Sequence, residues 1–474
     1  MTEFTVESVA IAIAVLAVLV VAATGIRRYV PWLRHLFIPN AVTAGFVALL
    51  LGPQVLGNLT GDDGWFSYGL FNEETVAVWA VLPGLLINVV FAAILLGKAL
   101  PSPRAIWNSS APPALFGATL SFGQYALGLL LAMLVLVPFF NMSELSGALL
   151  EISFTGGHGT AAGLSSTFSE LGFSEGTDLA LGLATVGLVA GILLGTVVIN
   201  RAVKSDSVFV ARTEEVDRED EDYDIDRMSQ YDAPEELEPD PATSPLTLVA
   251  GAIALAIALG WLIQQALMLL SALVADQAPD ETLVSEIPLF PFTIVGGALL
   301  QIVISVRGWS HLIPRKLVNQ VAGVALDLLI AAAIATLSLA AIGNNLIPFT
   351  LIVVVGLAWS LAALFWLARR FYGDHWFEPG IGDFGQSSGT VASGFLLIGM
   401  SDPQGSSGAR ESYGYKQLLY EPFLGGGFVT ALSLPIINRI GATWAFVAAT
   451  LLTLLMIFLG TQMRKRLVND SVRE

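Results

Sequence analysis

Two short polar stretches hold most of the residue types that could bind a small ligand. The first, TGGHGTAAG, occupies residues 155–163 and combines hydroxyls, an imidazole and glycines. The second, GQSSGT, occupies residues 385–390 and offers an amide and hydroxyls without a fixed charge. Glycine lets the backbone approach a ligand closely, bare N–H groups suit carboxylates, and carbonyl and hydroxyl oxygens suit a hard cation such as Na⁺. The two stretches therefore predict a site for a carboxylate, a cation or both.

The composition of the chain indicates where such a site must lie. Of the 474 residues, 55% are hydrophobic and only 13% are charged, and the mean hydropathy is +0.72. Soluble domains carry about 25% charged residues, so the sequence predicts a polytopic membrane protein. The absence of cysteine excludes a disulfide framework, a thiolate metal site and a cysteine nucleophile. A net charge of −17 and a membrane location exclude nucleic acid as a partner.

Long apolar runs predict the membrane-spanning helices. About 20 apolar residues are needed to cross about 30 Å of hydrocarbon. The first run has no basic segment before it and Arg27 and Arg28 after it, so it is predicted to be a retained span rather than a cleaved signal. We predict eleven spans, all α-helical, at about 6–26, 38–58, 76–97, 112–137, 177–200, 246–274, 288–306, 320–342, 346–368, 417–437 and 441–463.

The distribution of basic residues predicts the orientation. With the N-terminus outside and the C-terminus inside, every Lys and Arg except Arg439 falls on the cytoplasmic side, as the positive-inside rule requires. Counting 147–168 or 383–400 as a full span would destroy this bias. We therefore predict two re-entrant hairpins, the first entering from outside and the second from the cytoplasm. The alternative is a glycine-rich segment that only packs helices together.

The chain also looks doubled. Residues 205–244 hold 15 acidic and 3 basic residues and predict a solvated cytoplasmic linker. On each side lie five spans and one hairpin in the same order, which predicts inverted repeats at 1–204 and 245–437, followed by an extra span and tail at 438–474. Short matches support the pairing: GLLINVVFAAIL with GVALDLLIAAAI, GTAAG with GTVAS, and VINR with IINR.

The first of these matches places Asn88 opposite Asp327. Asp327 is the only acid well inside an otherwise apolar predicted span, and intramembrane carboxylates are usually functional. We predict that Asp327 and Asn88 contribute to a sodium site, or that Asp327 binds a substrate ammonium. The alternatives are a protonated or hydrogen-bonded carboxyl at Asp327 and an interhelical hydrogen bond at Asn88.

Several segments resemble the bacterial sodium/glutamate symporter family. They are ISFTGGHGTAAG with the following LGFSEGTDLALGLATVGLVAGILLG, FIPNAVTAGFVALLLG, DFGQSSGTVASGFLLIGMSDP and GYKQLLYEPFLGGGFVTALSLP. Two departures indicate a longer member with a divergent second hairpin: GQSSGTVA stands where the better-known glutamate carriers resemble GLGATPTA, and an eleventh span follows. The resemblance implies a homodimer in the cytoplasmic (inner) membrane, in which a substrate-carrying domain moves like an elevator past a scaffold.

The expected substrate site lies where the two hairpin tips meet at the membrane midplane. His158 is expected to contact the hairpin backbone or substrate rather than a metal, because no second histidine or cysteine lies near it in the sequence. Glu151 and Asp402 are expected to be solvated or capping acids near the surfaces. Glu421 is interpreted as a structural residue that could pair with Lys416 near the cytoplasmic surface. The predicted substrate-binding residues are Thr155, Gly156, Gly157, His158, Gly159, Thr160, Gly385, Gln386, Ser387, Ser388, Gly389 and Thr390.

These features favour a secondary transporter for sodium-coupled uptake of glutamate or a related acidic amino acid, with no cofactor. The sequence offers no phosphate-binding loop, nucleophile elbow or histidine pair at zinc spacing, which argues against an enzyme. Within the same class, coupling to protons or transport of another carboxylate is the alternative. From another class, a passive channel or a membrane sensor could keep the same fold.

Overall fold

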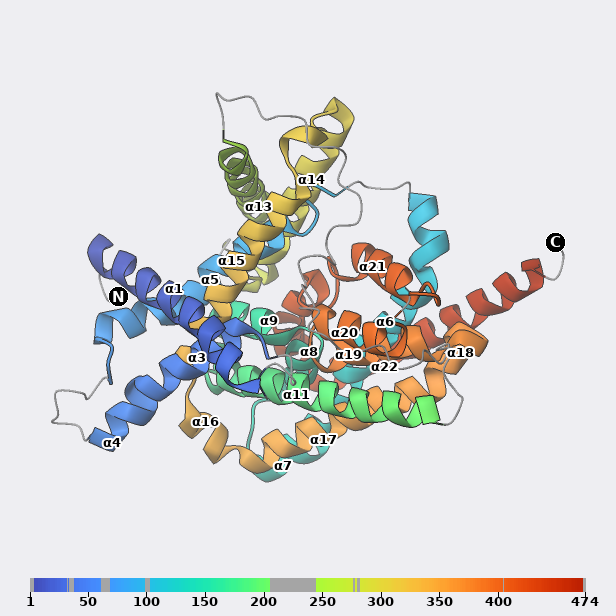
Figure 1. Ribbon diagram of the computed structural model, residues 1–474, viewed down its shortest axis with the longest axis horizontal. Coiled ribbons are helices and arrows are strands. Elements are labelled where there is room, and N and C mark those ends of the chain that lie inside the picture. The colour runs from blue at the N-terminus through green and yellow to red at the C-terminus, as the bar shows by residue number, and fades with distance from the viewer. Residues whose placement is uncertain are drawn as a thin grey trace.

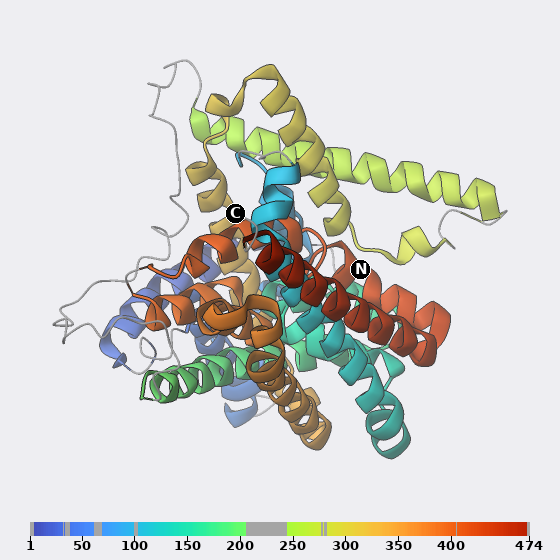
Figure 2. The ribbon, with the colours of Figure 1, turned by 90° about the vertical axis from the view of Figure 1, so that its right-hand side faces the viewer.

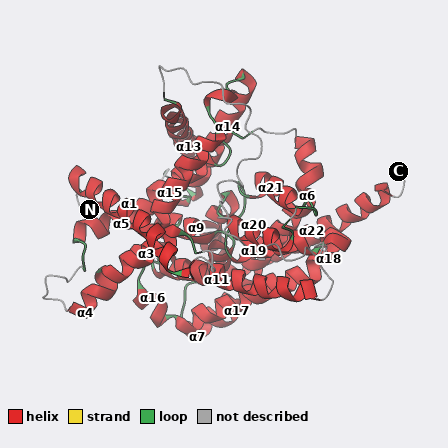
Figure 3. Cartoon of the chain, viewed as in Figure 1, coloured by secondary structure: helices red, strands yellow, loops and turns green. Residues whose placement is uncertain are grey.

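The computed structural model describes an entirely helical chain. The residues described are 4–31, 33, 38–60, 69–98, 103–204, 244–275, 278, 282–403 and 405–471, and they contain no strand (Figure 3). The predicted linker at 205–244 lies almost wholly outside the described residues. The all-α fold class and the membrane character are confirmed.

The longer helices carry the fold and shorter ones connect them (Figure 1). The bounds of the longer helices are α1 Val6–Tyr29, α3 Asn40–Leu51, α5 Glu73–Ala93, α6 Pro103–Leu131, α11 Glu175–Lys204, α13 Pro245–Ala275, α14 Phe290–Arg307, α15 Arg315–Ala335, α17 Leu346–Ala362, α19 Phe377–Ser388, α20 Val391–Ser401, α21 Ala409–Tyr420 and α22 Phe428–Ser471. The short helices are α4 Asn58–Thr60, α7 Val137–Phe140, α8 Leu149–Phe154, α9 Gly157–Gly163, α10 Ser165–Glu170, α16 Leu339–Asn344 and α18 Ala368–Tyr372.

Ten helices of the described chain are long and apolar enough to cross a membrane. The first nine correspond to the first nine predicted spans. The predicted span at 417–437 is interrupted, because the helix stops at Tyr420 and resumes only at Phe428. The segment Phe428–Lys465 consists of two helices that meet at Gly441, whose φ of 80° and ψ of 158° are not helical, just after the predicted boundary at 438–440. The count is ten rather than eleven because the helices on the two sides of Gly441 are counted together.

The long helices form two groups that do not follow the halves of the sequence. We call α1, α3, α5, α13, α14 and α15 the peripheral bundle, and α6, α8–α11 and α17–α22 the hairpin bundle. Within the first, α15 packs on α3 and α5, and α13 on α14; within the second, α22 and α21 pack on α6, and α19 on α20. The peripheral bundle fills the left and top of Figure 1, around the N-terminus, and the hairpin bundle the right and bottom. Each bundle thus takes helices from both halves of the chain.

The two bundles meet along the short helix α9. It packs against α5 and α15, and a Cβ placed on Gly163 would lie 2.6 Å from Cγ1 of Ile87 in α5. The absence of a side chain at Gly163 is therefore required for this contact. One buried apolar cluster continues across the junction and includes Phe91, Leu129 and Leu329. Figure 2 shows α13 (yellow-green) extending along the upper edge, away from this junction.

Candidate functional site

The first helix break lies inside the predicted first hairpin. Helix α8 ends at Phe154 and α9 begins at Gly157, whose φ of +72° is strained for any residue with a side chain. The N–H of Thr155 and that of Gly156 both donate to the carbonyl of Glu151, at 3.1 and 2.9 Å. The Thr160 hydroxyl donates to the carbonyl of Gly156 at 2.9 Å. The glycines and threonines of this stretch thus build a sharp, closely bonded turn.

The second break joins α19 to α20, which pack against each other. Gly389 separates the two helices with φ of −154° and ψ of −91°. Thr390 starts α20 through a capping box in which its side chain and that of Ser393 each accept from the other's backbone N–H. The helical pair covers Phe377 to Ser401, so its first helix begins before the predicted start at 383.

The two breaks face one another inside the hairpin bundle. A Cβ placed on Gly157 would lie only 3.3 Å from the carbonyl oxygen of Gly389. Gln124, from the C-terminal half of α6, connects both segments: its Oε1 accepts from the Thr155 hydroxyl at 2.6 Å, and its Nε2 donates to the Ser387 carbonyl at 2.6 Å. One side chain therefore fixes the spacing of two chain breaks that are more than 200 residues apart in sequence.

A third break, at residues 421–427, closes around Glu151. The Glu151 carboxylate accepts from the Tyr125 hydroxyl at 2.6 Å, the Thr430 hydroxyl at 3.0 Å and the Gly425 N–H at 3.3 Å. The side chain of Glu151 is 0% exposed. The expectation of a solvated acid near the surface is wrong, because α6, α22 and the third break together cover it. Asp402, in contrast, accepts from Ser406 and Ser407 and caps the loop after α20, as expected.

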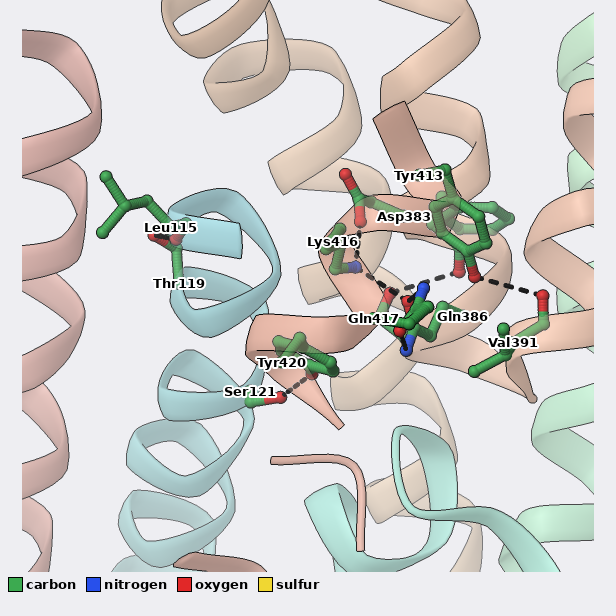
Figure 4. Close-up of polar contacts among 12 residues, drawn as sticks. Leu115, Thr119, Ser121, Asp383, Gln386, Val391, Tyr413, Lys416, Gln417 and Tyr420 are labelled. Carbon is green, nitrogen blue, oxygen red and sulfur yellow. Dashed lines mark hydrogen bonds and ion pairs between the residues drawn. The ribbon is translucent and has the colours of Figure 1, made fainter. Parts of the chain in front are cut away.

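A buried ion pair lies beside the second break (Figure 4). Lys416 of α21 and Asp383 of α19 are each 1% exposed and form a hydrogen-bonded salt bridge. The Lys416 ammonium also donates to Oε1 of Gln386 at 2.7 Å and stands 4.5 Å from the ring centroid of Tyr420. The predicted pairing of Lys416 with Glu421 is wrong, because α21 turns the lysine inward, toward α19.

The predicted substrate residues do not all converge. Thr155, Gly157, Ser387 and Gly389 lie at the facing breaks. The side chain of Gln386 points away, toward Lys416 and Gln417, with which it exchanges two amide hydrogen bonds of 3.1 Å. Further members of the predicted set have other neighbours: Gly159 faces Leu326 and Ile87, His158 bonds Thr185 at 2.9 Å, Ser388 packs on Gly187 and Gly191, and Gly385 packs on Gly394.

Asn88 and Asp327 lie in the peripheral bundle, on α5 and α15, which pack side by side. Both side chains are half-buried. The Asn88 amide donates to the carbonyls of Gly84 and Leu85 on its own helix, at 2.8 and 3.2 Å, and its Oδ1 is buried without a hydrogen-bond partner. Both residues therefore lie on the two helices that α9 contacts, but not at the facing breaks. A sodium site at these residues stays a prediction.

Three residues of the site have sequence features that indicate a buried polar role. Gln124 is an amide in the middle of a predicted span, where polar groups are costly and need a reason. Glu151 lies inside the predicted hairpin, and Lys416 precedes an apolar run. None of these signals names a partner, because the partners come from distant segments of the chain.

The arrangement presents groups that suit both signs of charge. Chain breaks inside a membrane bundle present amide N–H groups and carbonyl oxygens that regular helices would use internally. N–H groups at the starts of α9 and α20 suit a carboxylate, and carbonyl and hydroxyl oxygens suit Na⁺. Among the described residues, no group of three or more His, Asp or Glu side chains could hold a metal ion. Carbonyl and hydroxyl oxygens are thus the cation ligands that the described breaks offer.

Comparison with known proteins agrees with this geometry. A family model described as sodium/glutamate symporter matches residues 113–373, more than half of the chain. The chain is 29% identical over 238 residues to the sodium/glutamate symporter of Escherichia coli (strain K12), and equally so to that of Shigella flexneri. These alignments cover 49% of this chain and 51% of each relative, so the chain spans about half the length of the curated relatives it matches. The family match includes Gln124, Glu151 and the first break. The chain belongs to the sodium/glutamate symporter family.

Proposed function

We propose that this protein is a secondary active transporter that couples the inward movement of Na⁺ to uptake of glutamate or a related acidic amino acid. The observation that carries the proposal is the pair of facing breaks bridged by Gln124. Opposed breaks at membrane depth offer bare N–H groups to a carboxylate and oxygens to a cation at the same place. The names of the relatives point to the same substrate and ion.

The proposal extends to the mechanism and the setting. The hairpin bundle carries the substrate and slides past the peripheral bundle, with α9 at the sliding surface. The working unit is a homodimer in the inner membrane, with the N-terminus outside and the C-terminus in the cytoplasm. The basic residues near the ends of the spans support this orientation, since it leaves only Arg439 outside.

Uptake into proteoliposomes tests the proposal. Purified protein is reconstituted, and labelled glutamate is supplied with an inward Na⁺ gradient, then with K⁺ replacing Na⁺, and then with an imposed pH gradient alone. We expect saturable, uphill uptake that requires Na⁺. Uptake driven by the pH gradient alone would replace the coupling ion, unsaturable flux would indicate a channel, and no uptake of any carboxylate would indicate a sensor.

A matched pair of glutamine variants connects transport to the site. Gln124→Leu removes two hydrogen bonds and leaves the Thr155 hydroxyl and the Ser387 carbonyl without this partner. Each such loss costs about 1–3 kcal/mol, so uptake at low substrate should fall by about tenfold or more. Gln264→Leu removes an amide that bonds only the carbonyl of Ile287 in the peripheral bundle, and should leave uptake nearly unchanged. Equal uptake by the two variants would contradict the proposed site.

A further inference from the structure

Glu151 is a buried carboxylate without a cationic partner. It forms no ion pair with any basic residue that the structure describes, whereas the buried Asp383 of the same bundle is neutralised by Lys416. An isolated buried charge is strongly unfavourable, so such a group is paired, binds an ion or takes up a proton. Glu151 is therefore a buried acid whose charge no described basic residue balances.

The hydrogen bonds of Glu151 favour its ionised form. Tyr125, Thr430 and Gly425 all donate to it, two of them to Oε1 and one to Oε2. An ionised carboxylate accepts about four hydrogen bonds, so about one acceptor position is left. The Thr430 hydroxyl also accepts from the N–H of Gly426 at 3.2 Å, which fixes its orientation. The carboxylate is thus held in place while one of its lone pairs remains available.

The surroundings of Glu151 supply further oxygen atoms. Glu151 belongs to α8, whose C-terminal end presents carbonyls and the negative end of the helix dipole at the first break. A Cβ placed on Gly425 would lie 3.5 Å from the Thr155 carbonyl oxygen, so the first and third breaks touch beside the carboxylate. Hydroxyl oxygens of Tyr125 and Thr430 complete a set that contains only oxygen, the ligand type that hard cations prefer.

We propose that the Glu151 carboxylate binds the coupling Na⁺, with the hydroxyl oxygens of Tyr125 and Thr430 and a carbonyl of the first break as its other ligands. This assignment rests on the proposed function and names the cation site within it. It places the ion in the hairpin bundle, beside the facing breaks, and it is separate from the site predicted at Asn88 and Asp327. Bound Na⁺ would balance the carboxylate charge and hold the first and third breaks together.

Sodium binding to the purified protein tests the assignment. Thermal unfolding is followed by intrinsic fluorescence of the ten tryptophans, in NaCl series against choline chloride at constant ionic strength, with and without glutamate. The readout is the Na⁺ concentration that gives half of the stabilisation, so a general loss of stability does not affect it. Glu151→Gln should raise this concentration by about 10- to 100-fold. The control Glu144→Gln, which removes an exposed carboxylate bonded to the N–H of Ala442, should leave it unchanged.

The outcomes separate this assignment from the proposed function. Wild-type uptake that does not depend on Na⁺ would refute the proposed function. Na⁺-dependent uptake together with an unchanged Na⁺ requirement in Glu151→Gln would refute only this assignment, as would the absence of any Na⁺ effect on wild-type unfolding. A variant that binds Na⁺ normally but loses the pH dependence of uptake would make Glu151 a proton carrier instead. If Glu151→Gln does not fold, Thr430→Val takes its place: weakened Na⁺ binding supports the assignment, and unchanged binding overturns it.

Discussion

The salt bridge between Lys416 and Asp383 should couple the stability of α19 to that of α21. Both side chains are 1% exposed. The Asp383 carboxylate also accepts from the Tyr372 hydroxyl at 2.6 Å, and the Lys416 ammonium also donates to Oε1 of Gln386 at 2.7 Å. Lys416→Met leaves the Asp383 carboxylate with only the Tyr372 hydroxyl as a hydrogen-bond donor. Removing one partner of a buried pair costs about 3–5 kcal/mol, because the other charge stays buried without compensation.

The double variant is expected to recover much of this loss. In Lys416→Met with Asp383→Asn, neither side chain carries a charge, and no uncompensated charge remains in the bundle. A buried pair replaced by neutral residues of similar volume is often nearly neutral in stability. We therefore expect the double variant to lose less than the sum of the two single variants, with a coupling free energy of about 2–3 kcal/mol.

Chemical unfolding in detergent, followed by tryptophan fluorescence, measures the three free-energy changes of this cycle. The surface pair of Arg439 and Glu286, at 36% and 26% exposure, is the matched control, and its coupling should stay below about 1 kcal/mol. Additive losses at Lys416 and Asp383, within about 0.5 kcal/mol, would refute the reasoning, since they would mean that neither charge depends on the other in the folded protein.

Three further predictions concern other parts of the chain. Gly157→Ala strains a backbone with φ of +72° and crowds the carbonyl of Gly389, so it should weaken uptake. The control Gly172→Ala, where φ is +78° but no atom lies within 4 Å, should weaken uptake less. Equal effects of the two variants would rule out crowding at the breaks. Burial lowers the pKa of Lys98 from 10.5 to about 8, against the opposing charge of Glu421. Between pH 8 and pH 10.5 the Lys98 amine is protonated in the unfolded chain but largely neutral in the folded protein. The free energy of unfolding should therefore rise by about 1–3 kcal/mol over this pH range. Lys98→Met should flatten this rise in the same unfolding titration. Asp327→Asn should reduce the Na⁺ dependence of uptake, and full retention of uptake and dependence would exclude its coupling role.

The sequence is informative about the spans because hydrophobic length is a local property. Nine of the predicted spans match helices, since a run of about 20 apolar residues leaves few other solutions in a bilayer. The interruption of the predicted span at 417–437 also has a local cause. Pro422 and the three glycines that follow within LYEPFLGGGF favour a break, but averaging hydropathy over the whole run hides them.

The site was less predictable because its contacts join distant segments. The glycines and hydroxyls at 155–160 and 385–390 identify two breaks, but nothing local specifies that Gln124 connects them. In the same way, Glu151 resembles a surface acid until Tyr125 and Thr430 are brought to it by α6 and α22. Side chains that form ion pairs or hydrogen bonds across a bundle can be predicted as polar and membrane-embedded, while their partners depend on the tertiary fold.

The sharing of each bundle between both halves of the chain has a consequence for biogenesis. The ribosome adds Thr430, a hydrogen-bond partner of Glu151, 279 residues after Glu151, and it adds Ser387, a partner of Gln124, 263 residues after Gln124. At about 5–20 residues per second, these polar groups spend roughly 15–55 s in the inserted first half without their final partners. The first half should therefore remain near the insertion machinery or bind chaperones until α19 to α22 emerge. Helices synthesised last would complete a structure that those synthesised first cannot form alone.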